Sequence, residues 1–338
     1  MRTTTPAFAV GIALLASALT ACTAPAPEAS APNEVVTVRV GIERIASLAP
    51  LYIADANGYF EDAGIDLQIE NVTSGQDAIP LAATGQLDVV VAGFSAGMFN
   101  AIGAGLDVSV VGAVNVASGD LETSPSSLMV SKALYDSGEV TSVDDLAGRD
   151  VAAVGGVGSS GGYLVGQVLG TGGLTLDDVN IVNIAIPDVP AALESGAIAA
   201  GWTSAPFNTL AERDGIAVTL AVPEAGTTPV GVVFGGAFAD SDAASQFFDA
   251  LAHGAQDLAG GAIYDPENIA IVAKAVDQDP EVLAGLPLYT IYLPDLAPQL
   301  DVLESMEQIW MGVGAIEYAE PLDPAIYIDA SFSDAVEL

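Results

Sequence analysis

Residues 145–174 constrain the fold more than any other part of this 338-residue chain. A short apolar segment, residues 151–154, is followed by residues 155–162, which hold five glycines and two serines, and then by the apolar run 163–169. This order predicts a strand, a glycine-rich turn and the start of a helix. Glycine lets the backbone of such a turn come close to a ligand, and the unpaired N–H groups and dipole of the helix favour a negative group there.

Two other interpretations of this turn are a dinucleotide-binding fingerprint and a plain tight turn. Residues 156–161 fit the pattern G-x-G-x-x-G, but the dinucleotide fingerprint also requires an acidic residue about 20 residues further on, after a second strand. Asp177 and Asp178 stand at that distance and precede the next predicted strand, residues 180–184. No P-loop lysine follows the turn. We therefore predict a loop that cradles a ligand and no bound cofactor, with a plain tight turn as the alternative.

The composition excludes several classes of function. The chain has 44 acidic and 7 basic residues, a formal net charge of −37, which repels nucleic acid and anionic membranes. We interpret this charge as a solubility feature or an adaptation to salt. The single histidine, His253, and the single cysteine, Cys22, leave no His/Cys metal cluster and no intrachain disulfide. With 51% hydrophobic residues, the chain can build a substantial core in one or two domains.

The N-terminus predicts export and a lipid anchor. The apolar run 8–19 is too short to span a bilayer. It ends in Leu-Thr-Ala-Cys, which matches the lipobox of bacterial lipoproteins, where the cysteine is diacylated and the chain is cut just before it. We predict a lipoprotein signal peptide over residues 1–21, lipidation at Cys22, and a Pro/Ala tether over residues 22–34. The protein would then lie on the outer face of the cell membrane, held only by its lipid anchor. Ordinary secretion is the alternative.

From residue 35 onward, strand patterns alternate with helical patterns of about ten residues, which predicts α/β architecture with parallel sheets. Ligands of such sheets gather at the loops beyond the carboxyl ends of the strands. The predicted strands are residues 35–42, 66–70, 87–91, 108–114, 128–130, 151–154, 180–184, 197–202, 217–222 and 231–235. The predicted helices are residues 51–60, 76–84, 96–103, 163–169, 190–195, 207–213, 243–258, 266–276 and 298–311.

A weak internal repeat indicates two similar lobes. PLAATGQLDVVVAG, residues 80–93, and PAALESGAIAAGWTS, residues 190–204, share the order helix, glycine, strand and small-residue loop. Two similar α/β units that face each other leave a cleft between them, where small molecules commonly bind.

Several segments together resemble the solute-binding proteins of ABC importers in the nitrate/sulfonate/taurine and thiamine-pyrimidine group. They are VRVGIERIASLAPLYIADANGYFEDAGIDLQIE, ATGQLDVVVAG, SVDDLAGRDVAAV, GLTLDDVNIV and ESGAIAAGWTSAPF, and the resemblance covers residues 36–229. It implies the type II periplasmic-binding-protein fold, with lobe 1 formed by residues 35–126 and 230–338 and lobe 2 by residues 127–229. The lobes would close on one small molecule by a hinge motion. The protein would be a monomer that delivers its ligand to ABC permease subunits without any chemistry, cofactor or metal.

The second copy of the repeat departs from the family pattern at one position. Ala199 stands where the family usually has an aspartate, as Asp88 does in the first copy. Because that aspartate is mainly structural in the family, we expect the fold to be unaffected.

The resemblance places two large side chains in the ligand cleft. Arg44 is the basic residue that falls in a predicted cleft loop, and its guanidinium suits a sulfonate, carboxylate or phosphate. The alternative is a surface arginine paired with Glu43. Trp202 could stack on a planar ring or cover an aliphatic chain, and the alternative is a core residue at a strand end. The other predicted ligand-binding residues are small or polar: Ser47, Ser74, Gly75, Gly93, Ser95, Ser118, Gly158, Ser159, Ser160 and Asp188.

Two ligand classes and two other functions stay open at this point. A small organic anion, such as an alkanesulfonate, taurine or nitrate, suits Arg44 and the Gly/Ser loop and is the class we predict. An aromatic heterocycle, such as a pyrimidine or a flavin precursor, suits Trp202. An enzyme is disfavoured, because the thiamine-pyrimidine synthase of the resembling group uses a histidine and pyridoxal phosphate inside the cell, whereas His253 is predicted outside the cleft. A sensor or adhesion lipoprotein is the remaining alternative.

Overall fold

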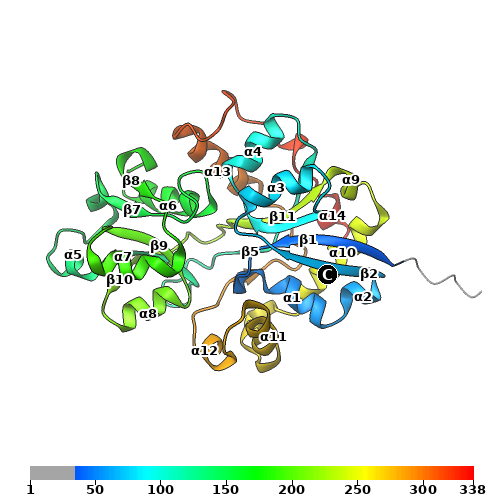
Figure 1. Cartoon of the computed structure of the whole chain (residues 1–338), viewed down its shortest axis with the longest axis horizontal. Helices are drawn as coiled ribbons and strands as arrows, with labels where there is room; N and C mark the ends of the chain where they lie inside the picture. The colour runs from blue at the N-terminus through cyan, green and yellow to red at the C-terminus, as the bar shows by residue number, and fades with distance from the viewer. Residues whose placement is uncertain (1–34) are drawn as a thin grey trace, which may run out of the picture. The chain divides into compact units, whose positions relative to one another are not determined.

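Two five-stranded sheets form the framework of the protein, which is represented by a computed structural model that describes residues 35–338 (Figure 1). The predicted signal peptide, Cys22 and the tether lie outside the described residues. None of the helices within residues 35–338 has the length and apolar character needed to cross a membrane.

The first sheet has the order β2-β1-β3-β11-β4. Its strands are β1 (Val36–Ile42), β2 (Ile65–Asn71), β3 (Val89–Gly93), β4 (Val108–Ala113) and β11 (Val230–Gly235). Strand β1 is parallel to β2 and β3, whereas β11 runs antiparallel to both β3 and β4. The place between β3 and β4 is therefore filled by a strand that comes more than a hundred residues after β4 in the chain.

The second sheet has the order β10-β6-β9-β7-β8. Its strands are β6 (Ser126–Ser131), β7 (Asp150–Ala152), β8 (Asn180–Val182), β9 (Ala200–Ser204) and β10 (Ala217–Ala221). Strand β7 is parallel to β8 and β9, and β6 runs antiparallel to β9 and β10.

The prediction of wholly parallel sheets is wrong at one strand in each sheet. The reversed strands, β11 and β6, are those by which the chain enters one sheet from the other. A strand that begins at the end of the sheet where its neighbours have their carboxyl ends must run antiparallel to them. The two crossing segments also hydrogen-bond each other, because Ala117 N–H donates to Thr227 O (2.8 Å) and Gly226 N–H donates to Ala117 O (2.9 Å).

The internal repeat corresponds to the topology of the two sheets. The first sheet has the order β2-β1-β3-β11-β4, and the second sheet, read from its other edge, has the order β8-β7-β9-β6-β10. Strands β3 and β9 therefore occupy the same place, each between a parallel neighbour and the reversed strand. One backbone hydrogen bond repeats as well: Asp88 N–H donates to Arg39 O, and Ala199 N–H donates to Asp150 O, both at 2.9 Å. Position 199 in the second sheet therefore corresponds to position 88 in the first.

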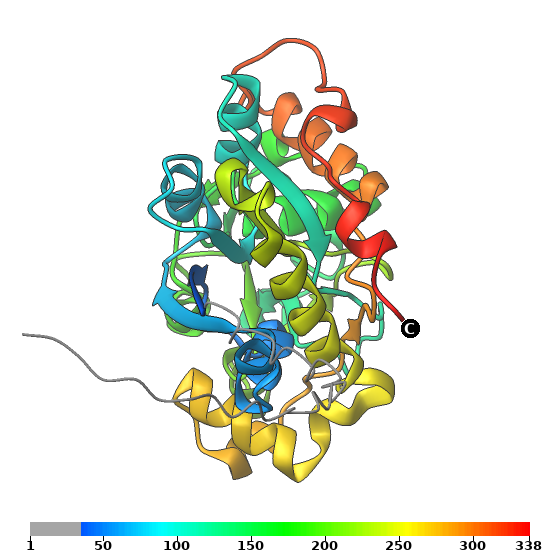
Figure 2. The ribbon, with the colours of Figure 1, turned by 90° about the vertical axis from the view of Figure 1, so that its right-hand side faces the viewer.

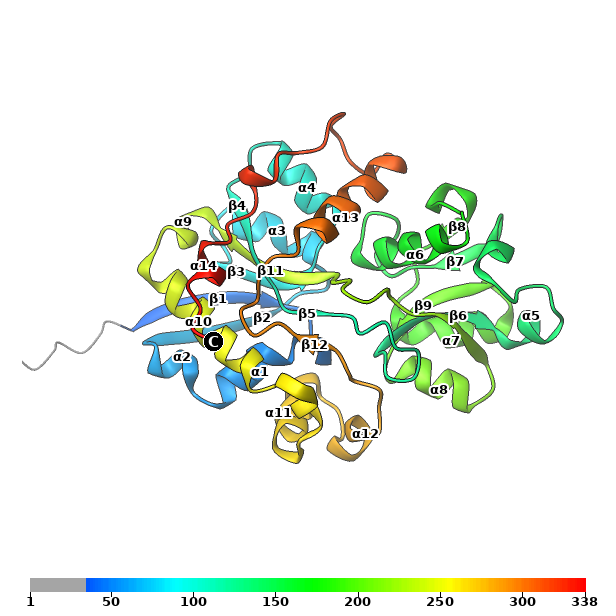
Figure 3. The same cartoon turned by 180° about the vertical axis from the view of Figure 1, so that it is seen from behind.

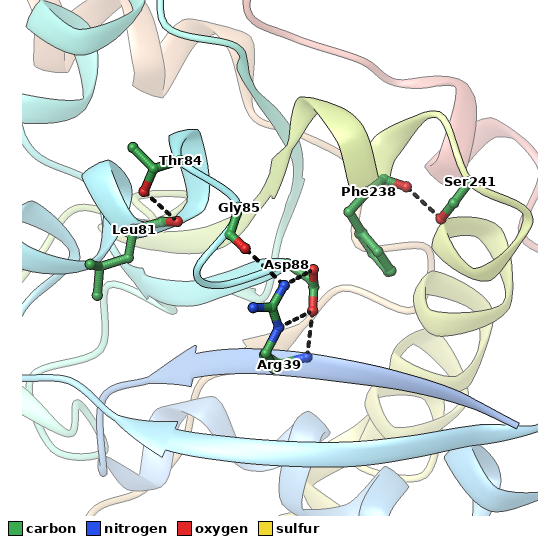
Figure 4. Close-up of polar contacts among 7 residues, drawn as sticks. All are labelled: Arg39, Leu81, Thr84, Gly85, Asp88, Phe238 and Ser241. Carbon is green, nitrogen blue, oxygen red and sulfur yellow. Dashed lines mark hydrogen bonds and ion pairs between the residues drawn. The ribbon is translucent and has the colours of Figure 1, made fainter.

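This correspondence gives a physical reason for Ala199. The carboxylate of Asp88 accepts hydrogen bonds from Arg39, at 2.8 Å from the backbone N and at 2.9 and 2.8 Å from Nε and Nη2 (Figure 4). In the second sheet the place of Arg39 is taken by Asp150. An aspartate at position 199 would face a like charge there, which is destabilising between adjacent strands.

Fourteen α-helices lie within the described residues. They are α1 (Ala49–Ala56), α2 (Tyr59–Asp62), α3 (Gly75–Ala83), α4 (Ala96–Gly103), α5 (Lys132–Asp136), α6 (Ser160–Thr171), α7 (Val189–Ser195), α8 (Phe207–Arg213), α9 (Gly236–Ala239), α10 (Asp242–Gln256), α11 (Pro266–Val276), α12 (Pro280–Ala284), α13 (Leu300–Gly312) and α14 (Ser331–Asp334). The predicted helix 51–60 is in fact two helices, because Gly58 adopts a left-handed conformation (φ 79°) between α1 and α2. Such a conformation ends a helix and suits glycine.

The hydrophobic core on the first sheet is rich in aromatic side chains. Phe234 of β11 packs against Phe247 and Phe248 of α10, with ring centroids 5.9 and 6.4 Å apart, and Figure 2 views the side of the ribbon on which α10 lies. A second cluster extends from the first sheet to the second. There, α13 lies against both α4 and α6 (Figure 3), and its fully buried Trp310 packs on Phe99 and Tyr163 with centroid distances of 5.8 and 6.3 Å.

Candidate functional site

The glycine-rich turn after β7 meets the loop after β3, so the carboxyl ends of parallel strands from both sheets come together there. Ala96, the first residue of α4, donates its N–H to Gly158 O at 2.8 Å. Ser160, the first residue of α6, lies against Gly93, since a Cβ built on Gly93 would be only 2.6 Å from Ser160 Oγ. We refer to Glu43, Gly75, Gly93, Gly158 and Ser160 as the strand-end junction.

Glu43 provides a partly buried carboxylate at the strand-end junction. It follows β1 directly, and its Oε1 accepts hydrogen bonds from Gly75 N–H (3.1 Å) and Gly93 N–H (3.3 Å). Burial raises the pKa of the Glu43 carboxyl, and the two backbone hydrogen bonds oppose that shift. A side chain at position 75 would overlap the carbonyl oxygen of Gly93, so only glycine permits this approach of α3 to the end of β3.

None of the arginine and lysine side chains in residues 35–338 pairs with the carboxylate of Glu43; each lies near another partner. Arg44 is exposed, and its Nε and Nη2 donate to Ala275 O near the C-terminus of α11, at 3.1 and 3.0 Å. A guanidinium in that position satisfies a free carbonyl and stabilises the helix end. The others are engaged as follows: Arg39 with Asp88, Lys132 with Asp136, Arg149 with Glu139, Arg213 with Asp214, and Lys274 near Asp55. Contact of Arg44 with a ligand stays a prediction.

Three of the predicted serines begin helices. The hydroxyls of Ser74, Ser95 and Ser159 accept hydrogen bonds from backbone N–H groups in the first turns of α3, α4 and α6, at 3.3, 3.2 and 3.0 Å. This is the usual role of serine at a helix N-cap. The N–H groups of Ser160 and Gly161, which begin α6, find no acceptor within residues 35–338. These are the free donors that the glycine-rich turn was predicted to present.

The remaining predicted residues lie outside the strand-end junction. Trp202 is 3% exposed and belongs to the core cluster that spans the two sheets. Ser47 contributes a backbone carbonyl that accepts a hydrogen bond from Asn115 at 2.9 Å. Ser118 caps a turn of the first crossing segment by accepting from Asp120 N–H at 3.2 Å, and Asp188 is exposed just before α7. Of the predicted set, Gly75, Gly93 and Ser160 come together beside Glu43, and Gly158 joins them through its contact with Ala96.

A cavity of about 530 Å³ lies elsewhere in the molecule. Its lining includes Tyr163 and Gln167 of α6, residues 224–227 of the second crossing segment, and residues 298–302 before and within α13. Gln167 Nε2 donates to Thr227 Oγ1 there at 2.6 Å. None of the predicted ligand-binding residues lines it. We assign the candidate site to the strand-end junction, because ligands of α/β sheets bind beyond the carboxyl ends of the strands.

Sequence reasoning missed Glu43, which was considered only as a partner for Arg44. The signal that could have found it is its position directly after the buried end of β1, a strand with parallel neighbours on both sides. In a parallel sheet, that position faces the ligand site.

Comparison with solved structures shows the type II periplasmic-binding-protein fold. The alkanesulfonate-binding protein SsuA from Xanthomonas axonopodis pv. citri, bound to MOPS, aligns with a TM-score of 0.65 at 17% identity, over 85% of this chain and 96% of its own. The periplasmic nitrate-binding protein NrtA from Synechocystis PCC 6803 aligns with a TM-score of 0.65 at 13% identity, over 90% and 86% of the two chains. A DszB mutant in complex with biphenyl-2-sulfinic acid aligns with a TM-score of 0.57 at 16% identity, over 89% and 98%.

The family assignment rests on the sequence. No curated protein sequence matches the chain significantly. A family model described as NMT1/THI5 like matches residues 45–268, more than half of the chain. The resemblance seen in the strand and loop segments is thereby confirmed, and the chain belongs to the NMT1/THI5-like family.

Proposed function

We propose that this protein is the lipid-anchored solute-binding component of an ABC importer. It would capture one small molecule outside the cytoplasm and deliver it to the permease subunits. The observation that carries the proposal is the strand-end junction, where Glu43 and Gly93 from the first sheet meet Gly158 and Ser160 from the second. A ligand bound there would touch both sheets, and the named binding functions of SsuA and NrtA support this use of the fold.

In this proposal, residues 35–126 and 230–338 form one lobe and residues 127–229 form the other. The paired crossing segments, which meet at Ala117, Gly226 and Thr227, serve as the hinge. A ligand that contacts both lobes shifts the population from open to closed conformations. The protein acts as a monomer and needs no cofactor for this step.

Binding without chemistry is the better-supported activity. His253 is exposed on α10, and its ring packs edge-on against Tyr59 of α2 at a centroid distance of 5.5 Å, a contact that involves no residue of the strand-end junction. The single histidine is therefore poorly placed to act on a ligand at Glu43. The alternative of a non-transport sensor lipoprotein draws no support from a specific contact in the structure.

Ligand closure provides the test of this function. Small-angle scattering of residues 31–338 should give a smaller radius of gyration at saturating ligand than without ligand, because both lobes contact the bound molecule. The ligand is identified beforehand by a thermal-shift screen, since a specific ligand raises the melting temperature by mass action. An unchanged radius at saturation would contradict the hinge mechanism.

The lipid anchor has its own test. Wild-type cells grown with labelled fatty acid should incorporate label into this protein, whereas Cys22→Ser should incorporate none and should be released into the medium. The expected difference is all or none, because Cys22 is the only cysteine. If Cys22→Ser stays with the membrane and the wild type carries no label, the anchor proposal is wrong.

A further inference from the structure

We infer that the ligand presents an N–H donor, either a protonated amine or an amino group on a ring, to the carboxylate of Glu43. The inference rests on the proposed function and names the class of ligand for the same site. It favours one subset of the molecules that the sequence left open: taurine and amino-pyrimidines carry such a donor, whereas nitrate and simple alkanesulfonates only accept hydrogen bonds.

The hydrogen bonds of Glu43 leave one of its two oxygens free. Oε1 accepts from Gly75 N–H and Gly93 N–H. Oε2 accepts no hydrogen bond from the described residues, and it is accessible to solvent, so a ligand can reach it. An ionised carboxylate only accepts hydrogen bonds, and a bound ligand that covers Oε2 without donating to it would leave a charged acceptor unpaired, which is costly. A ligand N–H placed on Oε2 avoids that cost.

The same contacts disfavour an anionic group at this point. The N–H groups of Gly75 and Gly93 would suit an oxyanion, but they are committed to Glu43, and that of Ala96 is committed to Gly158 O. An anion beside Glu43 would therefore face a like charge in a poorly solvated place, with the described arginine and lysine side chains engaged elsewhere. The net charge of −37 acts in the same sense, since it draws cations toward the protein and repels anions.

The position of Glu43 also couples such a ligand to the second sheet. Ser160 Oγ and Glu43 Oε1 border the same small space over Gly93, because a Cβ built on Gly93 would lie 2.6 Å from the former and 3.5 Å from the latter. The free N–H groups of Ser160 and Gly161 lie at the start of the same helix. A molecule with an amino group and a nearby acceptor could use both.

Glu43 could instead serve only to hold α3 against the end of β3. The variant Glu43→Gln separates the two roles. The amide keeps an Oε1 acceptor of the same shape for Gly75 and Gly93, removes the charge, and puts an NH2 donor in the place of Oε2, where it cannot accept a ligand N–H. Glu281→Gln is the matched control, since it removes one carboxylate from an exposed position on α12.

The experiment uses two isosteric pairs and one pure acceptor. Taurine is compared with 1-propanesulfonate, 4-aminopyrimidine with 4-methylpyrimidine, and nitrate is included alone. Binding to the full mature chain is measured by thermal shift and then by calorimetry. We expect at least one amino compound to bind at least tenfold more tightly than its methyl isostere. Glu43→Gln should weaken that binding by about 30-fold or more, the typical loss when a buried charged partner is removed. Glu281→Gln should leave it within about twofold.

Three results would overturn the inference. One is a methyl isostere or nitrate that binds as tightly as the amino compounds. Another is an amino compound whose affinity survives Glu43→Gln within about twofold. The third is a panel in which neither amino compound binds. If the lobes close on a ligand that only accepts hydrogen bonds, this inference is wrong and the proposed transport function stands. If no ligand changes the radius of gyration, the proposed function itself is contradicted.

The melting temperature of the ligand-free protein tests the role of Glu43 without any of the test compounds. A carboxyl whose pKa is higher in the folded protein than in the unfolded chain lowers the free energy of unfolding when the pH is above the unfolded-state pKa. Below that pKa the carboxyl is protonated in both states, and the loss disappears. Glu43→Gln should therefore raise the melting temperature at pH 7.5, with a gain that shrinks as the pH falls toward 4. The neighbouring titratable groups, Arg44 and Tyr52, are unchanged in the variant. A loss of stability at pH 7.5 would assign Glu43 a purely structural role and overturn the inference.

Discussion

Replacing Trp310 with alanine should lower the free energy of unfolding by about 3 to 5 kcal/mol, the usual cost of removing a buried tryptophan. Trp310 of α13 is fully buried, and its ring packs against Phe99 of α4 and Tyr163 of α6. Its removal opens a cavity where the core continues from one sheet to the other. At roughly 2 to 4 °C per kcal/mol for a domain of this size, the melting temperature should fall by about 6 to 20 °C.

Urea denaturation followed by circular dichroism would measure this change. Trp310→Phe is the matched control, because the indole Nε1 has no hydrogen-bond partner among residues 35–338 and phenylalanine therefore loses packing area alone. We expect Trp310→Phe to cost less than half as much as Trp310→Ala. A loss below about 1 kcal/mol for Trp310→Ala would show that the core adjusts around the gap, and it would contradict the role assigned to this contact.

Replacing Gly93 with alanine should weaken ligand binding by about 5- to 150-fold, which corresponds to the 1 to 3 kcal/mol that overpacking typically costs. The new methyl group would lie 2.6 Å from Ser160 Oγ, which is an overlap, and 3.1 Å from Ser160 Cβ, which is a tight contact, so Ser160 would have to shift. Because Gly93 belongs to the first sheet and Ser160 to the helix after the second sheet's β7, relief of the overlap would move the two sheets apart.

The double variant Gly93→Ala with Ser160→Gly tests this explanation. Removing the serine side chain should restore most of the lost affinity, so the two substitutions should be strongly non-additive. Calorimetry with the ligand found by thermal shift measures both effects. Gly170→Ala in α6 is the control, since an added Cβ there meets no atom within 4 Å. If the double variant binds no better than Gly93→Ala alone, steric separation of the sheets is not the cause.

The sequence predicts the order of elements well because the apolar pattern follows the strands closely. It fails where long-range topology decides. The direction of β6 and β11 depends on which edge of the sheet the chain enters, and no local pattern carries that information. The split of the predicted helix 51–60 arises at Gly58, whose left-handed conformation interrupts a helical pattern that the neighbouring side chains would otherwise continue.

The candidate site shows the same limit. Glycines and serines at strand ends are recognisable locally, and Gly75, Gly93, Gly158 and Ser160 do come together. The partner of Arg44 is not recognisable in this way, because Ala275 lies 231 residues further along the chain. Glu43 could not be recognised for a related reason. Its hydrogen-bond donors, Gly75 and Gly93, lie 32 and 50 residues away in the chain. They donate through backbone N–H groups, which almost every residue type has, so the sequence does not mark them as partners.

The late insertion of β11 has a consequence for how the chain is made. Every strand of the second sheet lies between Ser126 and Ala221, so that sheet can assemble as soon as this stretch has been synthesised or exported. The first sheet lacks its member between β3 and β4 until Val230 has emerged, after more than two thirds of the chain. Until then β3 and β4 present unpaired edges, which are prone to join strands of other molecules. Pairing over such sequence distances is also slow. The first sheet is therefore the part that needs protection longest, and chains that stop before Val230 should aggregate through the open edges of β3 and β4.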